Sequence, residues 1–202
     1  MLELSKRNSS FFIEDYREAD HLTLAELLEI PVDLLCPCAR HHSVHLANAP
    51  RVAARVICPG ANNPLTLEAE RLLFQRGILC VPDFVANSGG VLGGTMEFAS
   101  IDPVEIALFI GRHFEAAVCW ILERSLSRGV LPREVAVPLA MDRMLRIQQD
   151  ARRRSIPRTF LSWGLEFHRR SWIPPRIVPS LARSYFRRRV CQSFQSEKRT
   201  GL

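Results

Sequence analysis

The stretch that decides the fold is ARVICPGANNPLTLEAERLLFQRGILCVPD, residues 54–83. Its two ends, 54–59 and 77–83, are short apolar runs of the kind found in strands that are buried on both faces. The segment between them has helical spacing and begins after Thr66, a good N-terminal cap. A third apolar run, VDLLCP at 32–37, precedes the stretch at the spacing of another such unit. Strand, helix and strand in this order predict an α/β fold with a parallel sheet and right-handed crossovers.

Two further helices are expected after these strands. One has Asp102 as its N-terminal cap, Pro103 as its first residue and Glu105 completing a capping-box arrangement, and Gly129 ends it. The other begins at Pro132. Apolar residues recur at helical spacing in the first helix, and the face expected to be buried consists of Val104, Ala107, Leu108, Phe114, Val118, Ile121 and Leu122.

Charge divides the chain in two. The 202 residues include 27 Lys and Arg against 21 Asp and Glu, a net charge of +6. Residues 151–202 hold 13 of the basic and 2 of the acidic residues, so their net charge is +11 and that of residues 1–150 is −5. We therefore expect a domain over residues 1–150 and a basic, proline-interrupted extension over residues 151–202. The prolines that interrupt the extension are Pro157, Pro174, Pro175 and Pro179.

Composition also bears on the compartment. No apolar run approaches the ~18 residues of a membrane-spanning helix, and the first residues lack the apolar core of a secretory signal. The six cysteines lie mostly within apolar runs, which favours reduced, buried thiols. We therefore expect a cytoplasmic protein without a membrane span.

Glycine and asparagine gather in two loop-forming segments after the expected strands. Gly60 and Asn62 follow the second apolar run, and Asn87, Gly89 and Gly90 follow the third. Because ligands of an open parallel sheet bind beyond the carboxyl ends of its strands, these residues should border one crevice. Glycine lets the backbone approach a flat ligand, and asparagine amides both donate and accept hydrogen bonds. The alternative is that each residue only forms a turn.

Three segments carry motifs in a specific order: DLLCPCA (33–39), GANNPLTLEA (60–69) and RGILCVPDFVANSGGV (76–91), followed by Glu97. They resemble the cofactor-binding half of the glutamate/leucine/phenylalanine/valine dehydrogenases. In that family the corresponding motifs are D-hydrophobic-P-A/C-A, E-G-A-N-x-P-T-T-x-E-A and R-G-I-x-x-x-P-D-x-x-A-N-A-G-G-V. The resemblance extends from about residue 20 to about residue 150.

This resemblance implies an incomplete Rossmann-type parallel sheet with flanking helices. It also implies NAD or NADP as cofactor and an L-amino acid as the substrate of an oxidative deamination. Asn62 would contact the nicotinamide ribose, and Asn87 would hold the carboxamide. The cofactor-binding residues implied in this way are Cys38, Ala39, Asn62, Asn87, Gly89 and Gly90, and those on the substrate side are Val91 and Gly94.

The sequence departs from the family pattern at points that bear on activity. Pro59 replaces the usual Glu, and Gly94 stands where the glutamate enzymes have a Ser that helps to hold substrate. No G-x-G-x-x-G follows a strand, so the turn that should bind the pyrophosphate is absent. The family's catalytic lysine lies in a separate N-terminal domain, and this chain has only Lys6 and Lys198. Arginine cannot replace that lysine because its pKa stays above ~12, so we assign no catalytic residue.

These departures favour a truncated or split enzyme that is inactive alone. A sheet that lacks its central strand exposes a backbone edge, which invites pairing with another chain. The expected partners are a complementing N-terminal chain or further copies of this chain. An amino-acid substrate is expected only after such complementation.

Two other classes of function have candidate residues in the sequence. A zinc site is conceivable at 36–45, but its C-x-C pair lacks the usual spacing and Cys36 should point into the sheet, so we expect no metal. The candidate ligands there are Cys36, Cys38, His41, His42 and His45.

The second alternative is a non-catalytic interaction subunit that binds an anionic partner through the basic extension. There arginines alternate with Trp163, Trp172 and Tyr185. No nucleic-acid-binding motif is present, so nucleic acid is not the expected partner. The simpler interpretation is a solvated extension or a helix that docks on the domain.

Overall fold

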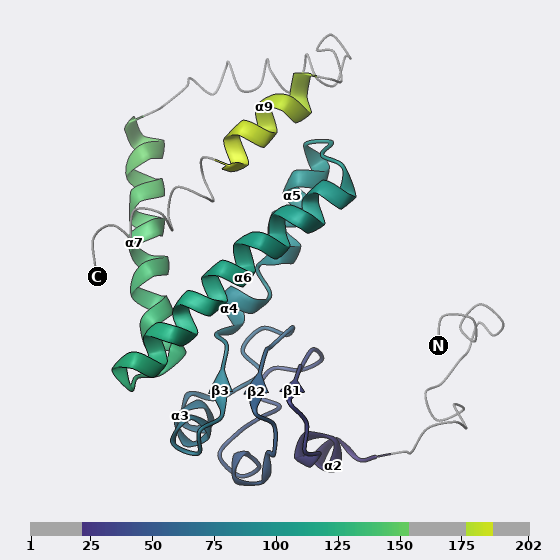
Figure 1. The fold of residues 1–202 in the computed structure, drawn as a ribbon, viewed down its shortest axis with the longest axis vertical. Coiled ribbons are helices and arrows are strands. Elements are labelled where there is room, and N and C mark those ends of the chain that lie inside the picture. Colours follow the sequence, from purple (N-terminus) through teal and green to yellow (C-terminus); the bar gives the residue numbers. More distant parts are fainter. Residues whose placement is uncertain (1–21, 154–176, 188–202) are drawn as a thin grey trace, which may run out of the picture.

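The computed structural model describes residues 22–153 and 177–187. Its sheet consists of three short strands, β1 (Leu34–Leu35), β2 (Val56–Ile57) and β3 (Leu79–Cys80). The strands are parallel and lie in the order β1-β2-β3 (Figure 1). The predicted α/β fold with a parallel sheet is confirmed.

Helix α3 (Leu67–Gln75) makes the crossover from β2 to β3. The Thr66 hydroxyl accepts a hydrogen bond from the Ala69 N–H at 3.3 Å, and Gly77 follows the helix with a φ of 80°. Both ends therefore lie where the sequence predicts them. Ala69 and Leu73 are completely buried, and burial of a leucine side chain contributes roughly 2 kcal/mol.

The core of this part lies between the sheet, α3 and the segment that leads into β2. That segment includes a short 3-10 helix, η2 (Ala49–Arg51), and the fully buried Val44 and Val52. Helix α2 (Leu24–Glu29) adds Leu28 to the same core and begins with a capping box between Thr23 and Glu26.

Residues 83–86 and 89–98 are helical with a two-residue turn between them, so the loop predicted from the glycines is wrong. The two helices are α4 (Asp83–Ala86) and α5 (Gly89–Phe98). A Cβ atom added to Gly89 or Gly93 would lie 3.3 Å from the side chain of Ile110 in the next helix. These glycines let two helices pack closely, and this packing outweighs the low helix propensity of glycine.

The two long helices, α6 (Pro103–Arg128) and α7 (Pro132–Arg153), begin at the predicted prolines. The Asp102 carboxylate accepts hydrogen bonds from the N–H groups of Val104 and Glu105, and Gly129 ends α6 with a φ of 65°. The capping box expected at Glu105 is wrong, because both Glu105 oxygens accept hydrogen bonds from Arg183 instead.

The buried face of α6 also differs from the predicted one in its first turns. Val104 and Leu108 are 67% and 56% exposed, whereas Ile106 lies beneath them against α5. Further along, Ala117 and Ile121 are buried, the latter as predicted.

Helix α9 (Ile177–Phe186) belongs to the basic extension and lies beside the upper part of α5 and α6 (Figure 1). Phe186 is 7% exposed and packs with Met96, Ile101 and Ile106. This part of the extension therefore docks on the domain. The remaining residues considered for the extension, among them Trp163 and Trp172, lie outside the described residues.

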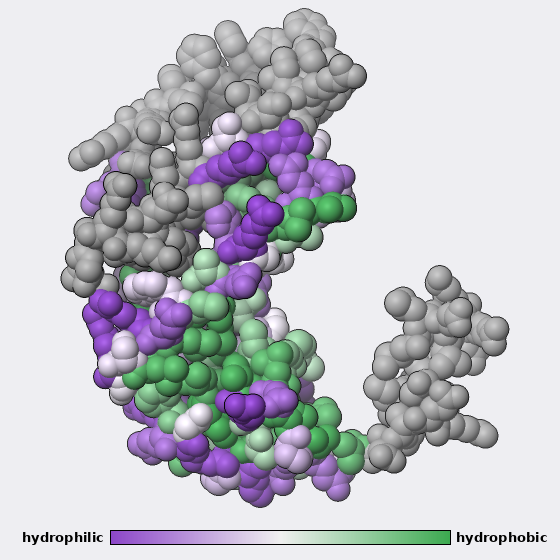
Figure 2. Space-filling view, in the orientation of Figure 1, coloured by the Kyte–Doolittle hydropathy of each residue, from purple (hydrophilic) through white to green (hydrophobic). Residues whose placement is uncertain are grey.

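In the described parts of the chain, no helix has the length and apolar character needed to cross a membrane. The face seen in Figure 2 is largely apolar over the sheet and the adjoining part of α6. Leu34 of β1, at one edge of the sheet, is 54% exposed.

Candidate functional site

Two asparagines meet at the carboxyl edge of the sheet. Asn62 follows β2, and Asn87 ends α4 shortly after β3. The Asn87 Nδ2 atom donates to Asn62 Oδ1 at 2.6 Å and to the Ala61 carbonyl at 3.3 Å. The expectation that these two amides lie together at one edge is confirmed, because parallel strands bring their carboxyl ends to the same edge. Their role toward a ligand stays a prediction.

This contact leaves hydrogen-bonding groups available. Among the described residues, Asn87 Oδ1 and Asn62 Nδ2 have no hydrogen-bond partner. Gly90 and Gly94 are exposed on α5, and a Cβ added to either would meet no atom within 4 Å. Val91, between them, is 79% exposed. The edge thus offers one acceptor and one donor next to an open helix surface.

Gly60 does not play the part expected of it. A Cβ atom added to Gly60 would lie 2.6 Å from Cys38 Sγ, so the missing side chain makes room for this thiol rather than for a ligand. Cys38 Sγ in turn lies 3.3 Å from the Cys36 carbonyl oxygen. Ala39, the next residue, is exposed.

The prediction of buried thiols is wrong for Cys36, Cys38 and Cys119, all of which are exposed. Because β1 ends at Leu35, Cys36 lies past the strand and does not point into the sheet. Cys80 is buried, and burial raises the pKa of its thiol to about 12. Burial, together with the neighbouring Cys36 and Cys38, also raises the pKa of Cys58. Cys80 and Cys58 therefore stay protonated at neutral pH.

Beneath the asparagine pair lies a charged network that the sequence analysis missed. Arg133 of α7 donates from Nε to Glu70 Oε2 at 2.7 Å and from Nη2 to Asp83 Oδ1 at 2.9 Å. The Asn63 N–H donates to Asp83 Oδ2 at 2.9 Å. The network therefore joins α3, α4 and α7 to the loop that carries Asn62. The one signal in the sequence is an acidic residue, Glu70, on the face of α3 that carries buried Leu73.

Burial and pairing shift the pKa values in this network. Burial raises the pKa of Glu70, although the hydrogen bond and charge of Arg133 act against it. Burial also acts to raise the pKa of Asp83, but the hydrogen bonds from Asn63 and Arg133 and the charge of Arg133 lower it overall. Glu70 Oε1 is buried and has no hydrogen-bond partner. Glu70 is buried, Asp83 is partly buried and both are paired with Arg133, so they support the edge of the sheet structurally and do not offer an acid or a base to a ligand.

Two histidines of the candidate zinc site contact each other, and one of them contacts an asparagine. His42 Nε2 lies 2.9 Å from Asn63 Nδ2, and the His41 and His42 rings meet edge to face with centroids 5.3 Å apart. Within residues 22–153 and 177–187, no three His, Cys, Asp or Glu side chains are grouped so that they could hold a metal ion.

A sequence profile of the glutamate/leucine/phenylalanine/valine dehydrogenases matches residues 1–102, half of the chain. The chain belongs to this dehydrogenase family. The match begins before the first motif, and the motifs at 33–39, 60–69 and 76–91 all lie within it.

Individual dehydrogenases agree with this assignment. The NADP-specific glutamate dehydrogenase of Saccharolobus shibatae is 37% identical over 143 residues, which are 66% of this chain and 34% of that protein. The glutamate dehydrogenase of Thermotoga maritima is 36% identical over 137 residues, which are 64% of this chain and 32% of that protein. The chain thus spans about a third of the length of these curated relatives.

Two solved dehydrogenases share the fold. The L-tryptophan dehydrogenase of Nostoc punctiforme matches with a TM-score of 0.54 and 28% identity, over 62% of this chain and 38% of that one. The hetero-hexameric glutamate dehydrogenase of Thermus thermophilus, in its leucine-bound form, matches with a TM-score of 0.59 and 23% identity, over 77% of this chain and 37% of that one. The first is an amino-acid dehydrogenase, and the second shows the likeness of the fold alone.

Dehydrogenases of this family use a nicotinamide cofactor, and the described residues offer groups that match part of it. The free acceptor Asn87 Oδ1, the free donor Asn62 Nδ2 and the open surface at Gly90 suit a carboxamide and a ribose. Elsewhere in the described part of the chain, no glycine-rich turn joins a strand to a helix in the way that binds a pyrophosphate. The described edge therefore fits one half of the cofactor.

Proposed function

We propose that the carboxyl edge of the sheet binds the nicotinamide half of NAD or NADP within an amino-acid dehydrogenase. The observation that carries this proposal is the 2.6 Å hydrogen bond from Asn87 Nδ2 to Asn62 Oδ1. Because this bond uses one donor and one acceptor of the pair, the outward amide groups are held in fixed positions. Asn87 Oδ1 then accepts from the carboxamide NH₂, and Asn62 Nδ2 donates to a ribose hydroxyl.

The neighbouring residues complete this half-site. Ala39 and the backbone at Cys38 line the ribose from the loop that follows β1, and Gly89 and Gly90 border the nicotinamide. Val91 and Gly94 lie further along α5 and face the substrate. The open surface at Gly90 and Gly94 supports this assignment, since a side chain there would occupy the space a ring needs.

We further propose that the 202-residue chain does not turn over an amino acid alone. The bound cofactor supplies the hydride acceptor, but deamination also needs a lysine of lowered pKa and a proton shuttle. The chain contains only Lys6 and Lys198, and neither belongs to a family motif. Reduction of NAD or NADP above background with glutamate, leucine, valine or phenylalanine would overturn this part of the proposal.

Half-cofactors test the binding site directly. We expect nicotinamide mononucleotide to bind the full chain, measured by saturation-transfer NMR or calorimetry, and adenosine diphosphate ribose to bind much more weakly. Asn62→Ala and Asn87→Ala should each weaken the mononucleotide by about tenfold, the effect of losing ~1.4 kcal/mol of hydrogen bonding. Gln148→Ala, at an exposed position of α7, is the matched control and should change nothing. Preference for the adenosine half, or unchanged binding in both Asn variants with an intact fold, contradicts the site.

A second proposal concerns the open edge of the sheet. Within the described residues β1 pairs with β2 on one side and has no strand on the other, and Leu34 is 54% exposed. We propose that this edge pairs with a strand of a complementing chain or of another copy of this chain. Leu34→Lys should abolish this proposed association, measured by sedimentation, whereas Leu46→Lys, at a 55% exposed loop position, should leave it unchanged. A chain that sediments as a monomer at all concentrations and binds no N-terminal dehydrogenase fragment refutes it.

A further inference from the structure

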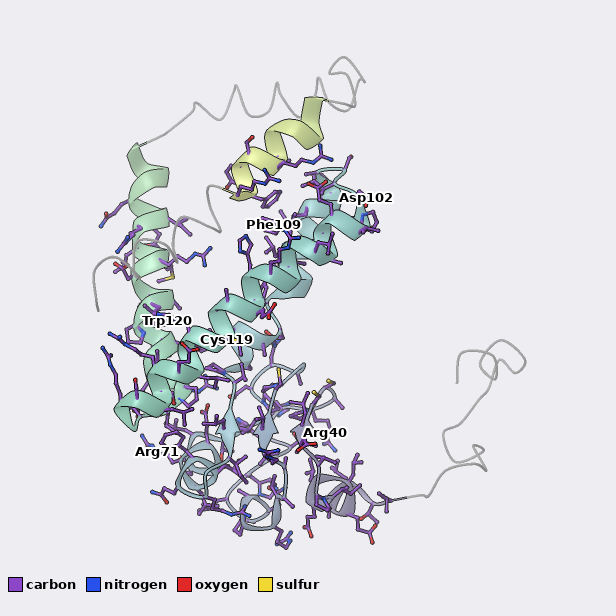
Figure 3. All side chains as sticks on the ribbon, viewed as in Figure 1. Arg40, Arg71, Asp102, Phe109, Cys119 and Trp120 are labelled. Atoms are coloured by element: carbon purple, nitrogen blue, oxygen red, sulfur yellow. The ribbon has the colours of Figure 1, made fainter. Side chains whose placement is uncertain are left out.

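A pocket lined by residues other than the asparagine pair lies between α5, α6 and α9. Its volume is about 350 Å³, within the range of roughly 300–1,000 Å³ typical of small-molecule sites. Three helices supply its walls: Met96 from α5, Leu108, Phe109 and Arg112 from α6, and Phe186 from α9. Figure 3 shows Phe109 on the side of α6 that is nearest to α9.

The inner wall of the pocket is apolar and held in place. Met96 and Phe186 are only 2% and 7% exposed and belong to one apolar cluster. Phe109 is fixed by an edge-to-face contact with His113, with ring centroids 4.3 Å apart and an interplanar angle of 89°. A ligand that enters the pocket therefore meets a preformed apolar surface.

The rim of the pocket is basic. Arg112, Arg183 and Arg187 line it, and Glu105 is the one acidic residue among the described lining residues. Arg183 holds both oxygens of Glu105, at 2.9 Å each. Arg112 and Arg187 form no ion pair with any residue in the described part of the chain. Two guanidinium groups thus flank the apolar wall without an ion-pair partner in residues 22–153 and 177–187.

We propose that this pocket binds an organic carboxylate with an apolar body, such as a medium-chain fatty acid. The carboxylate would pair with Arg112 and Arg187, since a guanidinium fork matches the two oxygens of a carboxylate. The apolar body would cover Met96, Phe109 and Phe186. This proposal does not depend on the cofactor site, which uses none of the residues that line the pocket.

The hydrogen bonds that Glu105 already accepts from Arg183 narrow the class of ligand that the pocket can bind. A free amino acid carries an ammonium group that needs an acceptor, but both Glu105 oxygens are already engaged by Arg183. An amino acid would therefore bury an ammonium group without a counter-charge, which is unfavourable. The pocket should select a carboxylate without an amino group.

Octanoate is a suitable probe for this site. Calorimetry with the full chain should show saturable binding of octanoate, at least tenfold weaker binding of L-2-aminooctanoate and of octanol, and none of octylamine. Arg112→Gln and Arg187→Gln should each weaken octanoate by about tenfold, as expected for loss of a charge-assisted hydrogen bond. Leu108→Glu should abolish binding by charge repulsion. Arg71→Gln, on the exposed side of α3, is the matched control.

Three results would overturn the proposal. One is equal binding of octanoate and octanol, which would mean that only the apolar wall contributes. Another is an unchanged affinity for octanoate in both arginine variants, provided that their circular dichroism and thermal unfolding match those of the wild type. The third is binding that arises only after deletion of residues 188–202, which would mean that the chain itself fills the pocket.

Discussion

Arg133 Nε donates to Glu70 Oε2 at 2.7 Å and so ties α7 to the helix that connects β2 and β3. The Glu70 side chain is 2% exposed and that of Arg133 is 25% exposed. A buried carboxylate without its cation is costly because the protein interior solvates charge poorly. The same guanidinium also holds Asp83, at the start of α4, which leads to Asn87. The asparagine edge therefore rests on this pair.

Arg133→Met should destabilise the fold by about 3 kcal/mol, the lower end of the range for breaking a buried ion pair. Urea unfolding at pH 7 measures this change. The matched control is Arg55→Gln, which breaks the exposed pair between Arg55 and Asp33, whose side chains are 81% and 86% exposed. This control should change the free energy of unfolding by less than ~1 kcal/mol. Equal effects of the two substitutions would show that the buried network contributes little.

Glu70 should make the fold less stable as pH rises. Burial raises its pKa above the ordinary 4.5, so the folded state binds this proton more tightly than the unfolded state. The stabilisation is fully present below the unfolded pKa and is lost as pH rises through the folded pKa. Relative to wild type, Glu70→Gln should therefore gain stability between about pH 4 and the folded pKa. Chemical unfolding across this range measures it, and a difference that shrinks with rising pH contradicts the assignment.

Asp83 should have the opposite effect. Hydrogen bonds from Asn63 and Arg133 outweigh burial and lower its pKa below the ordinary 3.8. Its stabilisation is therefore present above the unfolded pKa and lost as pH falls through the folded pKa. The cost of Asp83→Asn should be larger at pH 6 than at pH 3, measured by the same unfolding series. A cost that is independent of pH would mean that the carboxylate is not held in its charged form.

Gly60→Ala should destabilise the fold by about 1 kcal/mol, because the new Cβ would lie 2.6 Å from Cys38 Sγ. Cys38→Ala removes this sulfur, so the double variant should recover most of the loss. A double-mutant cycle by urea unfolding measures the coupling. Gly90→Ala is the control: no atom lies within 4 Å of its added Cβ, and it should stabilise α5 by roughly 0.5–1 kcal/mol. Absence of coupling between positions 60 and 38 would contradict the close contact.

Phe186 separates two roles of the basic extension. Because Phe186 is 7% exposed against Met96 and Ile106, Phe186→Ala should destabilise the fold by roughly 3 kcal/mol. It should not alter retention on heparin, which depends on the +11 charge of residues 151–202. Deletion of residues 188–202 should weaken heparin retention and its salt dependence without the same loss of stability. If the deletion instead destabilises the fold and leaves retention intact, charge is not the role of that segment.

The sequence by itself determined the parallel strands, the ends of α3 and α6, and the edge of the sheet at which the strands end. Thr66, Asp102 and Gly129 mark helix ends through contacts with residues only a few positions away, so the chain carries these signals locally. The meeting of Asn62 and Asn87 also follows from sequence, because parallel strands joined by α3 must bring their carboxyl ends together. The family motifs added the expectation of a nicotinamide cofactor at this edge.

Only the tertiary structure decided what lies across elements. Gly89 and Gly93 lie in a helix, where their lack of side chains lets α5 pack against Ile110 of α6. The residues near them in the sequence do not predict that contact. Arg133 forms hydrogen bonds with Glu70 and Asp83, which are 63 and 50 residues away in the sequence. Arg183 forms a hydrogen bond with Glu105, which the sequence pattern had assigned to a capping box. Helix propensities and caps amount to about 1 kcal/mol each, whereas close packing and buried charge pairs involve several. Where the two disagree, the longer-range interactions therefore prevail.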